Sequence, residues 1–372
     1  MIKVLSVFGT RPEAAKMAPL LAVLKDCPHI ESKIAVTAQH RSQLDQVLII
    51  FGITPDYDLD IMRPRQTLAE ITSMSLKGVE DVIKKENPNL ILVHGDTTTT
   101  LAASLAAYYC QKQLGHVEAG LRTYDKYQPF PEEINRRLTG AIADLNFAPT
   151  ETAKNNLIKE NISAHTIYVT GNTAIDCLRF TIKPSYQFTE TALNSLDFSK
   201  RVLVMTAHRR ENLGRPLVNI CGAVKRLVKD FEDIIIVYAV HLNPAVRETV
   251  FPILSGLPRV CLTDPLNIQD MHNLMNRSYM VLTDSGGLQE EVPSMGKPVL
   301  VLRNVTERPE AIEAGTAALA GIEEGGIYRS AVSLLTDSGM YNRMAQARNP
   351  FGDGHASERI RDAILAYYNL KG

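Results

Sequence analysis

The sequence lacks the features that mark membrane, secreted and polyanion-binding proteins. No apolar run is long enough to cross a bilayer, and the apolar start of "MIKVLSVFGTRPE" stops at Gly9, too early for a signal peptide. Charge of one sign is not in excess, because 40 lysines and arginines face 41 aspartates and glutamates. That balance argues against nonspecific polyanion binding. We expect a cytoplasmic protein with neither a membrane nor a nucleic-acid partner.

Cysteine is sparse and shows no pairing pattern. The five cysteines are scattered, odd in number and never spaced as C-x-x-C: Cys27, Cys110, Cys177, Cys221 and Cys261. This predicts free thiols in a reducing compartment.

Common cofactor and metal motifs are also missing. The first apolar run leads into "FGTRPEAAK", which has one glycine where a dinucleotide-binding turn needs G-x-G-x-x-G. The G-x-G of "FGDGHAS" (351–357) follows no strand, and no G-x-x-x-x-G-K-[ST] occurs. Neither H-E-x-x-H nor a D-x-D cluster is present, and no serine or cysteine has a nucleophile motif around it. We expect no cofactor and no metal.

Short apolar runs do alternate with segments of helical period along the whole chain. Strands are predicted at residues 2–8, 33–38, 90–94 and 115–118, and again at 234–240, 259–262, 279–283 and 298–302. Such alternation predicts α/β architecture with parallel sheets. "KVLSVFGTRPE" (3–13) is echoed by "RVLVMTAHRRE" (201–211), so we predict two doubly wound, Rossmann-like domains facing across a cleft.

The predicted domain boundaries follow from this repeat. Residues 1–172 form the first domain and 173–354 the second, with a connection at 173–200. The last helix, within 355–372, follows a turn at "NPFGDG". From the pattern alone this helix either completes the second domain or crosses back to the first.

Carboxylates follow two predicted strands of the first domain. Asp96 comes after the strand of "LILVHGDTTTT", Glu118 ends the next strand, and Glu132 follows the rigid "PFP" corner at the start of a helix. Three carboxylates at one rim repel, so at least one should have a raised pKa, as proton transfer requires. The competing interpretations are that Asp96 only caps the next helix and that the neighbouring Glu133 only serves the helix dipole.

Residues suited to binding phosphate lie mainly in the second half. Ser285, Gly286 and Gly287 open a helix after a strand, and helix N-terminal amides bind phosphate. Glu291, further along that helix, fits both hydroxyls of a ribose, and Arg308 follows the next strand. An ordinary helix cap, a solvated glutamate and a surface turn explain the same residues.

Three basic residues stand in the strand-to-helix turns. Arg11 and Lys16 follow the first strand and suit a diphosphate, although basic side chains at a helix start are more often solvated. His208, in "TAHRREN", suits the leaving phosphate or the sugar. A histidine bonded within its own loop is the competing interpretation.

Taken together, these blocks resemble the non-hydrolysing bacterial UDP-N-acetylglucosamine 2-epimerases. The resemblance runs in order from "FGTRPEAAKMAPL" through "HGDTTTTLA", "GHVEAGLRT", "PFPEEINRRL", "TAHRRENLG", "TDSGGLQEE" and "TERPEA" to "FGDGHAS". It implies a fold like that of the GT-B glycosyltransferases, with the last helix returning to the N-terminal domain. It also implies a homodimer that interconverts UDP-GlcNAc and UDP-ManNAc for surface polysaccharides or wall-polymer linkage units.

The resemblance implies roles by matching position. The acid/base group and its partner would be Asp96, Glu118, Glu132 and His208. The substrate-binding residues would be Arg11, Lys16, Ser285, Gly286, Gly287, Glu291 and Arg308. Many members are also activated by UDP-GlcNAc at a second site, for which the matching residues are Gln39, Gln43, Arg65, Arg209 and His241.

Other functions are compatible with the same fold. A GT-B glycosyltransferase shares the ribose glutamate but needs an acceptor pocket, and a hydrolysing relative would release free ManNAc and UDP. A non-catalytic sugar-nucleotide sensor would bind UDP-GlcNAc without turnover.

Overall fold

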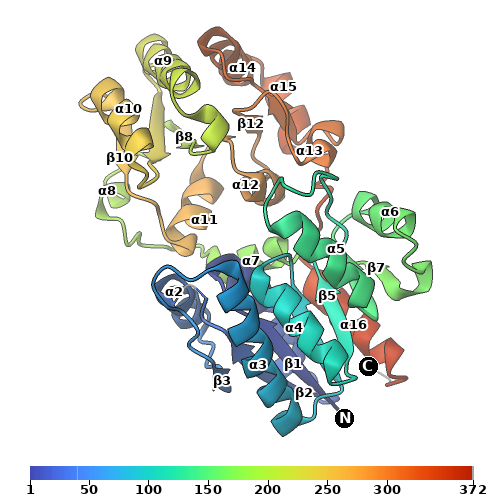
Figure 1. The fold of residues 1–372 in the computed structure, drawn as a ribbon. Helices are drawn as coiled ribbons and strands as arrows, with labels where there is room; N and C mark the ends of the chain where they lie inside the picture. The colour runs from blue at the N-terminus through green and yellow to red at the C-terminus, as the bar shows by residue number, and fades with distance from the viewer. Residues whose placement is uncertain (40, 371–372) are drawn as a thin grey trace. The chain divides into compact units, whose positions relative to one another are not determined.

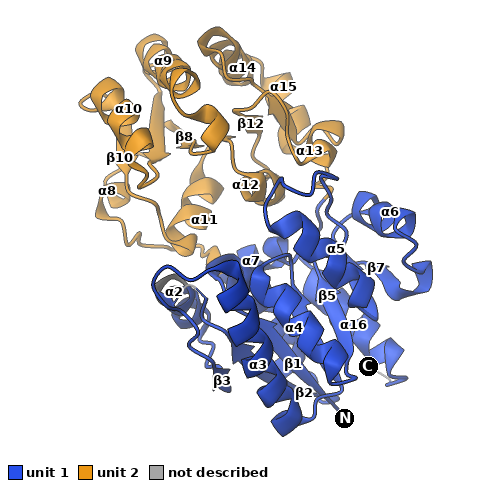
Figure 2. Cartoon of the chain, in the orientation of Figure 1, with its two compact units in different colours: residues 1–180, 351–372 blue, residues 181–350 orange. Residues whose placement is uncertain are grey.

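Two parallel sheets organise the chain, each in its own compact unit. In the computed structural model, which describes residues 1–39 and 41–370 apart from the side chains of Ser42 and Gln43, unit 1 comprises residues 1–180 with 351–372, and unit 2 comprises 181–350. Figure 2 shows the units in separate colours. Helices alternate with the strands of both sheets, which gives the α/β fold predicted from the sequence (Figure 1). None of the described helices combines the length and apolar character needed to span a membrane.

Unit 1 contains a seven-stranded sheet in the order β3-β2-β1-β4-β5-β6-β7, with every pair parallel. In chain order the strands are β1 (Ile2–Phe8), β2 (Ile30–Val36), β3 (Tyr57–Asp58), β4 (Leu90–His94), β5 (Gln113–Val117), β6 (Leu145–Ala148) and β7 (Ile167–Val169). The strand order reverses between β1 and β4, which is where ligands bind in open α/β sheets.

The helices of unit 1 fall into two contacting groups. One is formed by α3 (Leu68–Glu86), α4 (Thr98–Tyr109) and α5 (Glu132–Ile142), which lie side by side in Figure 1. The other is formed by α1 (Arg11–Lys25), α2 (Arg41–Phe51) and α16 (Ala356–Tyr367), in which α1 contacts both others. The remaining helical elements are α6 (Glu151–Lys159), η1 (Ala164–Thr166) and α7 (Thr173–Thr181).

Two buried features build unit 1. Apolar side chains of β1 and β4, including Leu5, Val7, Ile91 and Val93, are fully buried and cluster with alanines of α4. Asp176, in α7, is 1% exposed and accepts hydrogen bonds from the backbone N–H groups of two residues at the start of α16, Ala356 and Ser357. The C-terminal helix is therefore part of unit 1.

Unit 2 contains a six-stranded parallel sheet in the order β10-β9-β8-β11-β12-β13. Its strands are β8 (Arg201–Thr206), β9 (Ile234–Ala239), β10 (Val260–Thr263), β11 (Met280–Thr283), β12 (Val299–Val301) and β13 (Ala317–Leu319). Its helices are α8 (Thr191–Asn194), η2 (Arg210–Asn212), α9 (Arg215–Asp230), α10 (Pro244–Leu254), α11 (Ile268–Arg277), α12 (Gly286–Glu291), η3 (Val292–Met295), α13 (Pro309–Glu313), α14 (Glu324–Thr336) and α15 (Ser338–Ala345).

The internal repeat of the sequence corresponds to the centres of the two sheets. β1 pairs with β2 and β4, and β8 pairs with β9 and β11, so each repeated segment provides the strand beside the reversal of strand order. Each copy then continues into the turn that follows this central strand.

Candidate active site

A pocket of about 410 Å³ lies at the carboxyl ends of β1, β4 and β5 in unit 1. It is lined by Thr10, Arg11, Pro12, Glu13, Lys16, His94, Gly95, Asp96, Thr97, Glu118 and Glu132. All three predicted acid/base carboxylates of this unit and both predicted diphosphate residues are among them. The structure therefore brings these five residues together.

The turn after β1 is held by a buried carboxylate. A Cβ added at Gly9 would lie 2.0 Å from the Thr37 hydroxyl oxygen, so only glycine fits beside that residue. Glu13, 2% exposed, accepts hydrogen bonds from the backbone N–H groups of Gly9 (3.0 Å) and Thr10 (2.8 Å). These bonds fix the start of α1 and thereby the backbone that carries Arg11 and Lys16.

The threonine run after β4 forms the N-terminal cap and first turn of α4. Thr97 caps the helix, accepting a 3.1 Å hydrogen bond from the Thr100 N–H. Its hydroxyl donates to Glu13 (2.7 Å), and the Thr100 hydroxyl donates to the His94 carbonyl (2.6 Å). Because Thr97 caps the helix, the carboxylate of Asp96 is not used for capping.

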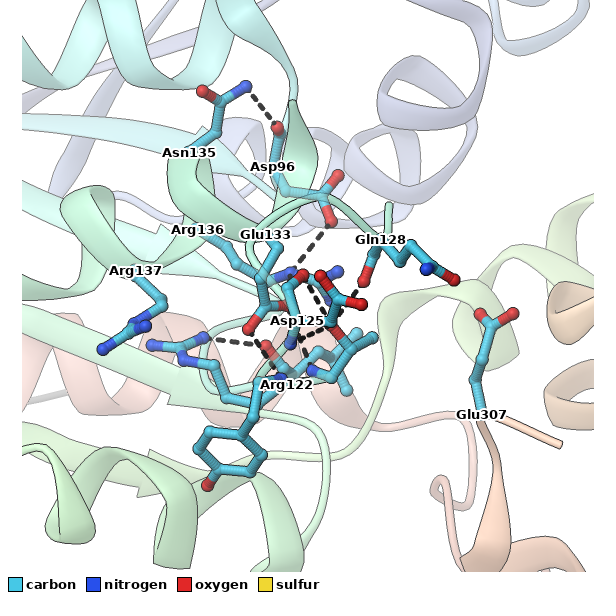
Figure 3. Close-up of polar contacts among 12 residues, drawn as sticks. Asp96, Arg122, Asp125, Gln128, Glu133, Asn135, Arg136, Arg137 and Glu307 are labelled. Carbon is cyan, nitrogen blue, oxygen red and sulfur yellow. Dashed lines mark hydrogen bonds and ion pairs between the residues drawn. The ribbon is translucent and has the colours of Figure 1, made fainter. Parts of the chain in front are cut away.

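Asp96 is half-buried, lines the pocket and lies near the buried guanidinium group of Arg136. Its Oδ2 lies 3.7 Å from Nε of Arg136, and its carbonyl accepts a 2.9 Å hydrogen bond from the side chain of Asn135 (Figure 3). Burial raises the pKa of Asp96 to about 6; the carboxylates of Glu118 and Glu132 add to that rise, and Arg136 opposes it. An acid with a pKa near 6 can both give and accept a proton at neutral pH.

Glu118 stands in a left-handed turn. The sequence predicted it as the last residue of a strand, but β5 ends at Val117 and Glu118 has a φ of +64°. Non-glycine residues in this region carry backbone strain, which is common at functional sites. Its Oε2 forms an ion pair with the ammonium group of Lys16 and accepts a 3.1 Å hydrogen bond from the side chain of Asn172. The turn directs the carboxylate toward the pocket.

The two glutamates at the start of α5 have different surroundings. Glu132 lines the pocket, and its Oε2 is buried with no hydrogen-bond partner among the described residues. Glu133 is completely buried and accepts the backbone N–H groups of Thr123 (3.0 Å) and Tyr124 (3.1 Å). It also lies 3.1 Å from Nε of Arg136. Glu133 therefore anchors a loop and a cation, and does more than serve the helix dipole.

In unit 2, His208 lies beside a buried aspartate. Asp284, fully buried, accepts hydrogen bonds from the backbone N–H groups of His208 (2.7 Å) and Arg209 (2.8 Å). The Nδ1 atom of His208 lies 3.5 Å from Asp284 Oδ1, and its ring stacks on that of His241 with centroids 5.2 Å apart. Burial lowers the pKa of His208, and the Asp284 carboxylate opposes that shift.

The predicted phosphate turn has the expected local form. Ser285 is the N-cap of α12, which begins at Gly286. A Cβ on Gly286 would lie 3.6 Å from the guanidinium carbon of Arg308, so the arginine stands over the turn. Arg308 in turn forms an ion pair with Glu290, which is 1% exposed.

Glu291, at the end of α12, is oriented by a histidine. Its Oε2 lies 3.3 Å from Nε2 of His272, whose Nδ1 is 2.7 Å from the hydroxyl of Thr181. These contacts restrict the rotamers of Glu291, the residue predicted to bind the ribose.

The five candidates for a second site are distributed over both units. Gln39 accepts a 3.1 Å hydrogen bond from Thr99 and Arg65 is exposed, both in unit 1. In unit 2, Arg209 lies 3.2 Å from Glu307, and His241 contacts His208. The side chain of Gln43 lies outside the described residues.

The unit 1 pocket combines three carboxylates with two cationic side chains, and the whole chain is similar to proteins of a named family. The family model for UDP-N-acetylglucosamine 2-epimerase matches residues 22–365. The chain is 56% identical to the UDP-N-acetylglucosamine 2-epimerase of Bacillus subtilis, over 100% of this chain and 97% of that one. This chain belongs to the UDP-N-acetylglucosamine 2-epimerase family.

Further comparisons agree on this epimerase family. The UDP-N-acetylglucosamine 2-epimerase of Escherichia coli is 51% identical over 98% of both chains. The crystal structure of the Neisseria meningitidis UDP-GlcNAc 2-epimerase, bound to UDP-GlcNAc, superimposes with a TM-score of 0.89 at 47% identity, covering 98% of this chain and 100% of that one. The chain is thus an isomerase of the non-hydrolysing type with two Rossmann-like domains of the GT-B kind.

Several residues beside the predicted site residues of the two units were not predicted. Glu13 lines the pocket beside predicted residues, and four further residues contact predicted site residues: His94, Asn172, Arg136 and Asp284. Only Glu13 carried a usable signal, since T-x-x-E at residues 10–13 is a capping-box pattern. The described residues contain no group of three or more histidine, cysteine, aspartate or glutamate side chains placed to hold a metal ion.

Proposed function

We propose that this chain interconverts UDP-GlcNAc and UDP-ManNAc by anti elimination of UDP to 2-acetamidoglucal, followed by re-addition. The Neisseria relative binds UDP-GlcNAc, which supports this substrate. The observation that carries the proposal is the pocket in which Asp96, Glu118 and Glu132 meet Arg11 and Lys16. Carboxylates for proton transfer and cations for a departing diphosphate are what this reaction needs.

The chemistry explains why both kinds of group are required. The C2 proton of the sugar is not acidic, because no carbonyl group stands beside it. When the C1–O bond to UDP breaks, positive charge grows at C1 and the C2 proton becomes acidic. Loss of the proton and of UDP gives the glucal, and protonation at the opposite face with return of UDP inverts C2. No cofactor takes part in these steps.

We assign Asp96, Glu118 and Glu132 to proton transfer, with His208 as their partner at the leaving group. Epimerisation needs one group that removes a proton from C2 and another that returns a proton to the opposite face. The raised pKa of Asp96, about 6, suits either role. Binding of the substrate is assigned to Arg11, Lys16, Ser285, Gly286, Gly287, Glu291 and Arg308. The proposed mechanism requires that the pocket retain UDP and the glucal until re-addition.

Exchange with solvent tests this mechanism directly. In deuterated water the protein and UDP-GlcNAc alone should give UDP-ManNAc with deuterium at C2, because the proton removed from one face is not the one returned to the other. A proton NMR time course measures both epimerisation and deuterium incorporation. Epimerisation needs no acceptor, whereas a glycosyltransferase needs one. Epimerisation without label at C2 would refute the elimination. Release of free ManNAc would indicate a hydrolase, and binding without turnover a sensor.

Glu291→Ala should weaken UDP binding. His272 contacts one carboxylate oxygen of Glu291 at 3.3 Å and restricts its orientation, and we assign this carboxylate to the ribose hydroxyls. Loss of hydrogen bonds to a charged group costs about 1.5–3 kcal/mol, or roughly 10- to 150-fold in affinity. Calorimetric titration with UDP measures it. Glu313→Ala, at the end of α13, is the control and should bind UDP like the parent.

We also propose activation by UDP-GlcNAc at a second site formed by Gln39, Gln43, Arg65, Arg209 and His241. The stacking of His241 on His208 supports it, because it places a candidate activator residue against a candidate reaction residue. The rate from UDP-ManNAc should rise on addition of trace UDP-GlcNAc. Full reverse activity from UDP-ManNAc alone would count against activation.

The setting of the enzyme is proposed on the same basis. All five cysteines are free thiols in the structure, which supports a reducing, cytoplasmic location. We expect a homodimer that supplies ManNAc units for surface polysaccharide or wall-polymer linkage.

A further inference from the structure

His94 is a buried histidine at the end of β4 that lines the pocket. Its side chain is 3% exposed, and neither imidazole nitrogen has a hydrogen-bond partner among the residues that the structure describes. Buried polar groups are nearly always paired, and one left without a partner destabilises the fold. An unpaired histidine at a reaction pocket therefore points to a partner gained in another state of the enzyme.

The carboxylate of Glu118 lies beside the His94 ring. Nε2 of His94 lies 3.9 Å from Glu118 Oε2, which is beyond hydrogen-bond distance. The same oxygen already receives the ammonium group of Lys16 and the side-chain amide of Asn172. A carboxylate oxygen has about two lone-pair sites, so His94 and Lys16 compete for one position.

We propose that His94 is a positioning residue that replaces Lys16 on Glu118 when a nucleoside diphosphate enters the pocket. The Lys16 ammonium then turns to the diphosphate, and the His94 Nε2–H donates to Glu118 Oε2. The step rests on the proposed function, because it needs a diphosphate near Lys16. It requires a shortening of about 1 Å between two side chains that already face each other.

The exchange changes the charge around Glu118. Four titratable or charged groups whose interaction with this carboxylate is described are Lys16 from α1, His94 from β4, Asp96 from the following turn and His116 from β5. Burial lowers the pKa of His94 to about 4 and that of His116 to about 3, so both rings are neutral at pH 7. Among these groups only Lys16 is a cation.

Replacing that cation by a neutral N–H makes Glu118 a stronger base. The side chain of Glu118 then receives hydrogen bonds from Asn172 and His94, and so keeps its direction. The carboxylate thereby becomes ready for proton transfer only when the leaving group is present. This links diphosphate binding to the acid/base chemistry of the pocket.

NMR of protein labelled with ¹⁵N in its histidine rings tests the exchange, with UDP as the probe. The His94 Nε2-bound proton, assigned by its loss in His94→Gln, should move downfield into the hydrogen-bonded range at saturating UDP. Lys16→Met should show that shifted signal without UDP, because the competitor is gone. Lys25→Met, an exposed lysine of the same helix, is the matched control and should behave like the parent.

Turnover supplies a second readout. His94→Leu should lower kcat about 10-fold, because a misplaced carboxylate slows the chemical step. It should also weaken UDP binding, because no donor then replaces Lys16 on Glu118. His94→Gln, which keeps a donor, should recover most of that loss. A His94 signal that neither UDP nor Lys16→Met moves would overturn the exchange, as would equal losses of kcat in both His94 variants. Absence of epimerisation in the parent would instead refute the proposed function, and the NMR arms would still decide the exchange.

Discussion

Asp96→Asn should lower turnover by about 100-fold or more while leaving UDP binding largely intact. The amide has nearly the same shape but neither accepts nor donates a proton at the site, and loss of a positioned acid/base group costs 10²- to 10⁴-fold. Glu118→Gln should have an effect of the same size. Initial rates by NMR and calorimetric titration with UDP separate turnover from binding. Near-normal rates in both variants would disprove the acid/base assignment.

The same Asp96→Asn variant should be more stable than the parent at neutral pH. The pKa of Asp96 is raised from 3.8 to about 6 by burial, so the folded state holds the proton more tightly than the unfolded state does. Its contribution is favourable below pH 3.8 and is lost as the pH rises through 6. At pH 7 the ionised carboxylate of Asp96 therefore costs about 3 kcal/mol of stability, and the neutral amide of Asn does not carry this cost.

Urea unfolding between pH 4 and pH 8 measures this stability difference. The advantage of Asp96→Asn should be small near pH 4, grow up to about pH 6 and then remain constant. Asp81→Asn, which removes one exposed carboxylate on α3, controls for the change in net charge. A gain in stability that is independent of pH would show that desolvation of the Asp96 carboxylate is not its source. A carboxylate kept at a cost in stability is expected where function requires it.

The sequence was sufficient to predict the strands that carry the pocket. Residues 2–8 and 90–94 are mainly apolar runs that each lead into a glycine, and the structure has β1 and β4 at those residues. The two strands pair directly, and β5 follows β4 in the sheet. Residues just after their carboxyl ends therefore meet, which is why Asp96 and Glu118 line one pocket.

Contacts between distant segments were not predictable in this way. Asn172 is 54 residues from Glu118, and Asp284 is 76 from His208. No period or motif connects such pairs, because their contact depends on how loops end after neighbouring strands. Glu133 shows the same limit: its two N–H partners come from the loop before α5, which has no periodic pattern. Its position at a helix start suggested only an interaction with the helix dipole, whereas the side chain is completely buried and binds two backbone N–H groups.

The structure resolves one alternative that the sequence left open. Asp96 and Thr97 are both suitable helix caps, and their order alone does not choose between them. Thr97 accepts the hydrogen bond from the Thr100 N–H, and Gly95, with a φ of +68°, turns the chain so that Asp96 borders the pocket. The threonines therefore satisfy the backbone of α4 and Glu13, while the preceding carboxylate remains available to a ligand.

Glu13→Ala should cause the largest loss of stability of the substitutions considered, about 3 kcal/mol or more. The carboxylate is buried and receives four donors, the N–H groups of Gly9 and Thr10 and the hydroxyls of Thr97 and Thr100. Removing it leaves these groups unpaired, each at about 1–3 kcal/mol, with partial relief by relaxation or entry of water. Chemical unfolding of variant and parent measures the loss.

A matched control is present on α3. Thr67 and Glu70 form the same capping box, with Glu70 accepting the Thr67 N–H at 2.7 Å, but both residues are exposed. Water replaces the lost acceptor in Glu70→Ala, so its effect should be much smaller than that of Glu13→Ala. Equal losses would mean that Glu13 acts only as a local cap. The larger loss should come with weaker UDP binding, because the turn that Glu13 fixes carries Arg11 and Lys16.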